Sequence, residues 1–258
     1  MILRYALLGA VQGIAEFLPV SSSGHLVLLQ TWMGIDPPGV LLEALLHLAT
    51  LAAILVTFRG DLASLGRALT PRGTLEHRKE TGLLIAGTVP IVVVGLALQS
   101  SMDALFSSLT AVSIGFLAGG TLLVASSFIE RRRRHEVRFA DALAIGVGQA
   151  AALLPGLSRS GVTISIGLLV GLSPRRAARF SFLLAIPALL GAGLLSLWHA
   201  VTSPAAIGGD GWGYVIAMIV AFAVGLAAIR ALLALVARGR LWGFGAYCIA
   251  LGVVTLFL

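Results

Sequence analysis

Two short polar segments interrupt otherwise apolar sequence and hold most of the side chains that could do chemistry. The first contains Gln12 and Glu16 and continues as Pro19-Val-Ser-Ser-Ser-Gly-His25, and the second is Pro155-Gly-Leu-Ser-Arg-Ser-Gly161. In apolar surroundings the carboxylate of Glu16 needs a cationic partner, and Arg159 in the other segment is the natural one. The pair has two interpretations, an ion pair that only locks the two segments together or part of a functional site.

Both segments have the features of an anion-binding site. Each break is followed by an apolar helical stretch, beginning near His25 and near Val162, and helix N-termini present free N–H groups and a positive dipole end. Arg159 can bind phosphate oxygens in a bidentate manner. Serine hydroxyls add donors at Ser21, Ser22, Ser23, Ser158 and Ser160, although they can also serve simply as helix caps. A phosphate or diphosphate is the ligand that fits best.

Two residues are candidates for the nucleophile of a reaction on such an anion. Ser22 could act with an adjacent base such as Glu16 or His25. His25 could itself attack, or act as a general acid and base. Gln12 lies one helical turn before Glu16 on the same face. Weaker candidates for the lining of the same cavity are Thr163, Ser165, Gln149, Glu43 and His47.

The composition identifies the solvent of this fold. Apolar residues make up 58% of the 258-residue chain and charged residues only 11%, too few to cover a soluble protein of this size. The net charge of +7 lies in short clusters between apolar runs, as in loops that face anionic lipid. This distribution argues against a nucleic-acid partner and for the bilayer.

The apolar runs predict an all-α integral membrane protein in which residues 1–258 form one membrane domain. Six runs are long enough to cross about 30 Å of hydrocarbon as helices. They are 40–58, 82–98, 109–129, 180–198, 214–236 and 241–258. Two further stretches, 2–34 and 139–172, are broken by the polar segments, and each predicts a re-entrant helical hairpin. Non-helical backbone at membrane depth requires surrounding protein or a wet cavity.

Basic residues orient the chain. They gather in segments 59–79, 131–138, 175–179 and 238–240, whereas the loops around Asp36, Asp103 and Asp210 have none. The positive-inside rule then places the acidic loops outside, so the two hairpins enter from opposite sides. At an offset of 137, Gly9, Gln12, Ala15, Ser21, Ser23 and Gly24 recur as Gly146, Gln149, Ala152, Ser158, Ser160 and Gly161. We therefore expect inverted repeats, 1–129 and 139–258, with a site where the hairpins meet.

The segments Gln12-Gly-Ile-Ala-Glu-Phe-Leu-Pro-Val-Ser-Ser-Ser-Gly-His25 and Pro155-Gly-Leu-Ser-Arg-Ser-Gly-Val-Thr163 resemble the two signatures of the bacterial undecaprenyl-diphosphate phosphatases, the bacitracin-resistance family. The resemblance extends over essentially the whole chain, including residues 180–187. It implies six spanning helices and two re-entrant hairpins, hydrolysis of undecaprenyl diphosphate to the monophosphate carrier of cell-wall synthesis, and a location in the bacterial cytoplasmic (inner) membrane with a site open to the periplasm.

The resemblance also implies roles for individual residues. The catalytic positions of the family fall on Glu16, Ser22, His25 and Arg159, and Gln12 occupies the first position of the acidic motif. A divalent cation, Mg²⁺ or Ca²⁺, is expected at Glu16. Many members have glutamate where this chain has Gln12, and this departure weakens any mechanism that needs two carboxylates on one metal.

A second hypothesis belongs to another class of protein. Inverted repeats with breaks at the midplane are also typical of transporters, so the same anion-binding pocket could serve a flippase for a prenyl phosphate lipid. Under either hypothesis the partners are a polyprenyl lipid and the bilayer, and a homodimer is compatible with the sequence.

Overall fold

The computed structural model describes residues 2–33, 40–71, 73–99, 102–106, 108–128, 134–202 and 211–257. The regular elements in these ranges are α-helices, and one isolated β-bridge joins Arg134 to Leu172. The helices are α1 (Ile2–Ala15), α2 (Ser22–Met33), α3 (Val40–Thr57), α4 (Arg59–Arg67), α5 (Leu75–Leu98), α6 (Met102–Phe106), α7 (Leu109–Ser127), α8 (Phe139–Ala151), α9 (Arg159–Leu169), α10 (Pro174–Thr202), α11 (Gly211–Ala237) and α12 (Trp242–Leu256). Asp36, Asp210 and Arg131 to Arg133, used above for orientation, lie outside the described residues.

The prediction of an all-α membrane protein is confirmed. Among the described residues, α5, α7, α10 and α11 are long and apolar enough to cross a bilayer, and α3 with α4 makes a fifth candidate although the two are bent by 77°. The predicted span 241–258 corresponds to α12, which has 15 residues and is only about 22 Å long. The six segments predicted to span are therefore helical. Only four of them are long enough to cross, or five if α3 and α4 form one bent span.

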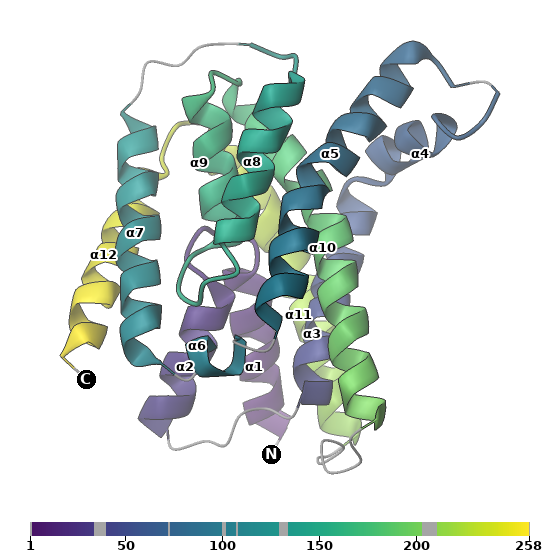
Figure 1. The fold of residues 1–258 in the computed structure, drawn as a ribbon. Helices are drawn as coiled ribbons and strands as arrows, with labels where there is room; N and C mark the ends of the chain where they lie inside the picture. The colour runs from purple at the N-terminus through teal and green to yellow at the C-terminus, as the bar shows by residue number, and fades with distance from the viewer. Residues whose placement is uncertain are drawn as a thin grey trace.

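Helices from the two halves of the chain pack against each other in pairs. α1 lies along α11 and α5 lies along α8, while α3 pairs with α10 and α7 pairs with α12. Figure 1 shows α7 and α12 side by side at one edge of the bundle and the arm formed by α4 and the start of α5 projecting at the opposite edge. Each of these four pairs joins a helix from residues 1–129 to one from residues 139–258, so the halves are not separate domains.

The two predicted breaks both exist, and each separates a pair of short helices. α1 and α2 approach from the end of the bundle where the chain begins, whereas α8 and α9 approach from the opposite end, and both turns lie near mid-height (Figure 1). The helices after the breaks begin earlier than expected, at Ser22 and Arg159 rather than near His25 and Val162. The reason is that the preceding residues, Ser21 and Ser158, cap them, since their hydroxyls accept the N–H groups of Gly24 and Gly161 at 3.3 and 3.2 Å.

The two breaks touch each other through backbone that has no room for larger side chains. A Cβ on Gly24 would lie 3.0 Å from the Cα of Gly156, and a Cβ on Gly161 would lie 3.2 Å from the Cβ of Pro19. Gly24 and Gly161 are related by the offset of 137, and so are Pro19 and Gly156. The contact is therefore made twice, by equivalent residues in exchanged roles.

Gly156 offers a test of how the second break packs against α7. Its φ of +81° and the carbonyl of Val112 beside it exclude a side chain, so we expect Gly156→Ala to cost roughly 1–3 kcal/mol of folding free energy. Thermal unfolding of the detergent-purified protein measures the loss. Gly191→Ala is the matched control, because nothing lies within 4 Å of a Cβ at that position. Equal unfolding temperatures for the two variants would contradict this account of the packing of the second break.

Candidate functional site

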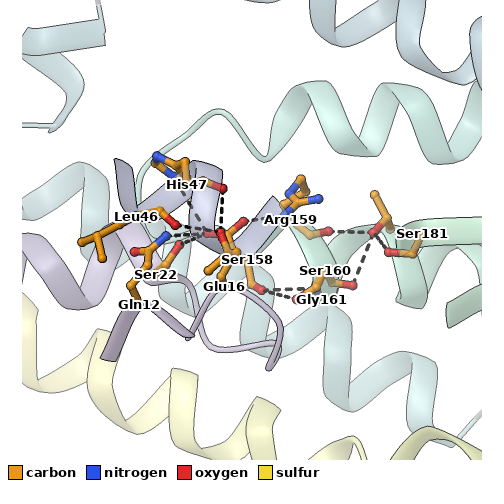
Figure 2. Close-up of polar contacts among 12 residues, drawn as sticks. Gln12, Glu16, Ser22, Leu46, His47, Ser158, Arg159, Ser160, Gly161 and Ser181 are labelled. Atoms are coloured by element: carbon orange, nitrogen blue, oxygen red, sulfur yellow. Dashed lines mark hydrogen bonds and ion pairs between the residues drawn. The ribbon is translucent and has the colours of Figure 1, made fainter. Parts of the chain in front are cut away.

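Glu16 is the centre of a buried polar cluster. It directly follows the last residue of α1, and the residue as a whole is only 7% exposed. Its Oε2 accepts hydrogen bonds from Ser22 Oγ at 2.9 Å and from Gln12 Nε2 at 3.1 Å, while its Oε1 accepts one from Arg159 Nη2 at 2.5 Å. Figure 2 shows these side chains converging on the carboxylate from both breaks. The cluster thus joins residues 143 positions apart, as predicted for Glu16 and Arg159.

The ion pair between Glu16 and Arg159 is shielded from solvent on both sides. The exposed fractions of the two side chains are 6% and 16%. In such surroundings a charge without its partner is strongly destabilising, so each residue requires the other. Among the described residues the guanidinium makes no other polar contact, which leaves Nε and Nη1 available to a further anion.

Ser22 and Arg159 occupy the same place in the two breaks. Each is the first residue of a helix, and each donates to Glu16. The N–H groups of a first helical turn lack intrahelical acceptors, and the dipole there favours negative charge. A hydroxyl, a guanidinium and two helix N-termini therefore converge on one carboxylate. This arrangement can bind a phosphoryl group and place an oxygen nucleophile against it.

The remaining serines of the two motifs lie at the starts of α2 and α9. Ser21 and Ser158 cap these helices as described above, and phosphate binding by their hydroxyls stays a prediction. Ser23 Oγ lies 3.3 Å from Ser21 Oγ, and Ser160 Oγ lies 3.2 Å from Ser158 Oγ. Ser21 also adopts a φ of +70°, a left-handed conformation that is uncommon for a residue with a side chain and is found at functional sites.

His25 lies beside the cluster rather than in it. Its Nδ1 is 2.7 Å from the carbonyl oxygen of Ser21, and its Nε2 is 2.7 Å from the hydroxyl of Tyr247 on α12. Both ring nitrogens therefore have partners other than Glu16. Tyr247 was not among the predicted site residues, because a lone tyrosine in an apolar span has no distinguishing pattern in the sequence.

The weaker candidates lie in different surroundings. His47 of α3 belongs to the site, since its Nε2 is 3.9 Å from Glu16 Oε2. Thr163 and Ser165 instead bond to neighbouring helices, Thr163 to Ser181 at 2.5 Å and Ser165 to Ser126 at 3.0 Å. Gln149, the offset equivalent of Gln12, is fully buried, and its amide atoms have no hydrogen-bond partner among the described residues.

The donor set fits a resident divalent cation poorly. Both oxygens of Glu16 already accept hydrogen bonds, one of them from a guanidinium, and Gln12 supplies no second carboxylate. No group of three histidine, cysteine, aspartate or glutamate side chains with metal-binding geometry occurs in the part of the chain that the structure describes. Mg²⁺ and Ca²⁺ prefer several oxygen ligands, so a cation at Glu16 stays a prediction and no step below depends on it.

Comparison with known proteins identifies relatives along nearly the whole chain. The family described as "Bacitracin resistance protein BacA" matches residues 5–254. An undecaprenyl-diphosphatase of Syntrophotalea carbinolica is 42% identical, and the alignment covers 97% of this chain and 96% of the relative. Undecaprenyl-diphosphatases of Desulforapulum autotrophicum and Korarchaeum cryptofilum are each 39% identical, with coverage of 96% and 98% of this chain and 95% and 97% of the relatives.

The buried ion pair predicts a characteristic pattern of stability. Arg159→Met leaves Glu16 without its cation and should cost about 3–5 kcal/mol, whereas adding Glu16→Gln should recover part of that loss. Thermal unfolding in detergent measures both variants. Arg240→Met, at an exposed arginine, is the control and should change little. A double variant that is less stable than Arg159→Met would show that the two charges do not depend on each other.

Proposed function

Because the chain belongs to the bacitracin resistance protein BacA family, we propose that it acts at the Glu16 cluster. The chain is a membrane phosphatase that hydrolyses undecaprenyl diphosphate to undecaprenyl phosphate and inorganic phosphate, the activity for which its relatives are named. The observation that carries the assignment to this site is the meeting of Ser22, Glu16 and Arg159 within hydrogen-bonding distance at two opposed helix N-termini.

The diphosphate would bind where its charge is compensated. Arg159 can keep Glu16 on one nitrogen and offer its other nitrogens to phosphate oxygens. The first-turn N–H groups of α2 and α9 add donors without a side-chain entropy cost. Such pre-positioned donors stabilise the charge that develops on the phosphoryl oxygens as the bond breaks.

The first chemical step would use Ser22 as the nucleophile. Its Oγ forms a bond to the terminal phosphorus while its proton passes to Glu16 Oε2, the oxygen to which it already donates. The bond from the terminal phosphorus to the bridging oxygen breaks, and undecaprenyl phosphate leaves with that electron pair. The sequence left Ser22 and His25 as alternatives. The direct contact with a carboxylate favours Ser22.

The second step would be hydrolysis of the phosphoserine. Ser22 and His25 are three residues apart on α2 and therefore share a face of the helix. His25 can take a proton from a water molecule that attacks phosphorus. The bond between Oγ and phosphorus then breaks and inorganic phosphate leaves, Ser22 Oγ takes back the proton that Glu16 received in the first step, and His25 releases its proton to solvent. The comparisons do not favour the flippase hypothesis, since the relatives are named as phosphatases.

For the fold we propose six spans and two re-entrant hairpins in inverted repeat. Support comes from the exchanged pairs, α1 with α11 and α5 with α8, and from the doubled contact between the breaks. α12 would reach across a locally thin part of the bilayer. A homodimer remains compatible with the apolar outer faces, and nothing in the mechanism requires one.

For localisation we propose the bacterial inner membrane with the site open to the periplasm. The helix α4, which begins at Arg59 and ends at Arg67, lies toward the end of the bundle opposite the N-terminus (Figure 1). The positive-inside rule makes that end cytoplasmic, and the hairpin that carries Ser22 then enters from the periplasm.

The nucleophile assignment can be tested with purified protein in detergent and undecaprenyl diphosphate. Ser22→Ala should lower phosphate release by roughly a thousandfold or more, as expected when a nucleophile is lost. Ser127→Ala removes a hydroxyl that donates to the carbonyl oxygen of Leu123 on the same helix, α7, and should leave the rate unchanged. Trapping with labelled substrate should yield acid-stable phosphoserine. Acid-labile phosphohistidine would instead assign the attack to His25.

The orientation predicts which surface residues are reached from outside the cell. In a Cys248→Ala background, Phe257→Cys should react with a membrane-impermeant maleimide on intact cells, because Phe257 is exposed at the proposed periplasmic end. Thr70→Cys, in the exposed turn between α4 and α5, should react only after permeabilisation. The reverse pattern would invert the topology.

A further inference from the structure

We infer that Tyr247 acts through His25: it fixes the plane of the imidazole and carries the proton of the attacking water to it in the hydrolytic step. The inference rests on the proposed function and extends it to a residue outside both sequence motifs. Tyr247 lies on α12, 222 residues from His25, and its hydroxyl is 2.7 Å from His25 Nε2.

The tautomer follows from the other side of the ring. His25 Nδ1 lies 2.7 Å from the carbonyl oxygen of Ser21. A carbonyl oxygen can only accept, so Nδ1 carries the proton. In the neutral ring Nε2 is then the acceptor, and the hydroxyl of Tyr247 donates to it. Together the two contacts leave a single neutral tautomer, with the basic lone pair on Nε2.

Two aromatic rings fix the plane of the imidazole. The ring of Tyr247 is inclined by only 14° to the His25 ring at a centroid distance of 5.7 Å, and Phe116 of α7 meets it edge-on at 5.6 Å. Phe116 is itself fully buried. The plane of the imidazole is thus held between α7 and α12 while its Nδ1 is tied to the cap of α2. During hydrolysis the hydroxyl of Tyr247 can stay on Nε2, because it can accept a proton from the attacking water molecule while its own proton passes to the ring.

The neighbouring residue shows that this contact is part of the packing of α12. Cys248 is buried, and its thiol donates to the carbonyl oxygen of Pro19 at 3.6 Å. Consecutive residues of α12 therefore contact the break and the helix after it. Otherwise α12 packs mainly along α7. Tyr247 thereby links the last helix of the chain to the base of the proposed reaction.

A double-mutant cycle tests the inference. Tyr247→Phe keeps the ring and removes one hydrogen bond, so kcat should fall by roughly five- to tenfold with KM little changed. Tyr247→Ala, which also removes the ring contact, should lower kcat by roughly a further tenfold. In a His25→Ala background Tyr247→Phe should have no effect, because a residue that acts through His25 loses its role with it. Tyr214→Phe, on α11, is the matched control and should retain the wild-type rate.

The outcomes separate this inference from the proposed function. An inactive wild-type protein would overturn both. An active wild type with a fully active Tyr247→Phe variant, or with equal losses in the two backgrounds, would overturn only the role of Tyr247. If His25→Ala turns over too slowly to measure, ¹⁵N-histidine spectra decide. The resonance of His25 Nε2 is identified as the one that is absent from the spectrum of His25→Ala. It should shift in Tyr247→Phe and not in Tyr214→Phe. An unshifted resonance in Tyr247→Phe would contradict the inference.

Discussion

The ion pair between Glu16 and Arg159 is the interaction on which the rest of the site depends. A buried carboxylate without a cation is among the most unfavourable arrangements in a protein interior, and here the cation comes from the other half of the chain. Both breaks must therefore end at the same depth and face each other. The serine caps, the glycine contacts and the helix pairs around the tips are the means by which the chain meets this requirement.

The two breaks resemble each other in backbone and differ in chemistry. At the offset of 137, the serines and the glycine after each break are the same, but Glu16 corresponds to Leu153, Ser22 to Arg159 and His25 to Val162. The first half supplies acid, hydroxyl and imidazole, and the second supplies the positive charge. Gln149 corresponds to Gln12, but the second half has no acid at the position that corresponds to Glu16. The buried amide of Gln149 accordingly has no hydrogen-bond partner among the described residues.

The features predicted from the sequence are those with a local signal. The two breaks interrupt long apolar runs, and a carboxylate and a guanidinium in apolar sequence had to be paired, so the hairpins, Glu16 and Arg159 could be placed in advance. The exact helix starts were missed because capping by Ser21 and Ser158 depends on backbone angles. His47 was a candidate only as a polar residue in an apolar span. Tyr247 was missed, because it reaches the site from a helix that looks like an ordinary apolar span and only the packing of α12 brings it there. The length of α12 relative to a full span was also not evident from its hydropathy.

The doubled contact between Pro19, Gly24, Gly156 and Gly161 has a mechanical consequence. Gly24 lies against the backbone of Gly156, and Gly161 lies against the ring of Pro19. A shift of either tip would therefore displace the other. The binding site for the lipid headgroup is then largely formed before the lipid binds. Motion during turnover is then left to side chains such as Arg159, whose other nitrogens can turn to an incoming phosphate while one nitrogen stays on Glu16.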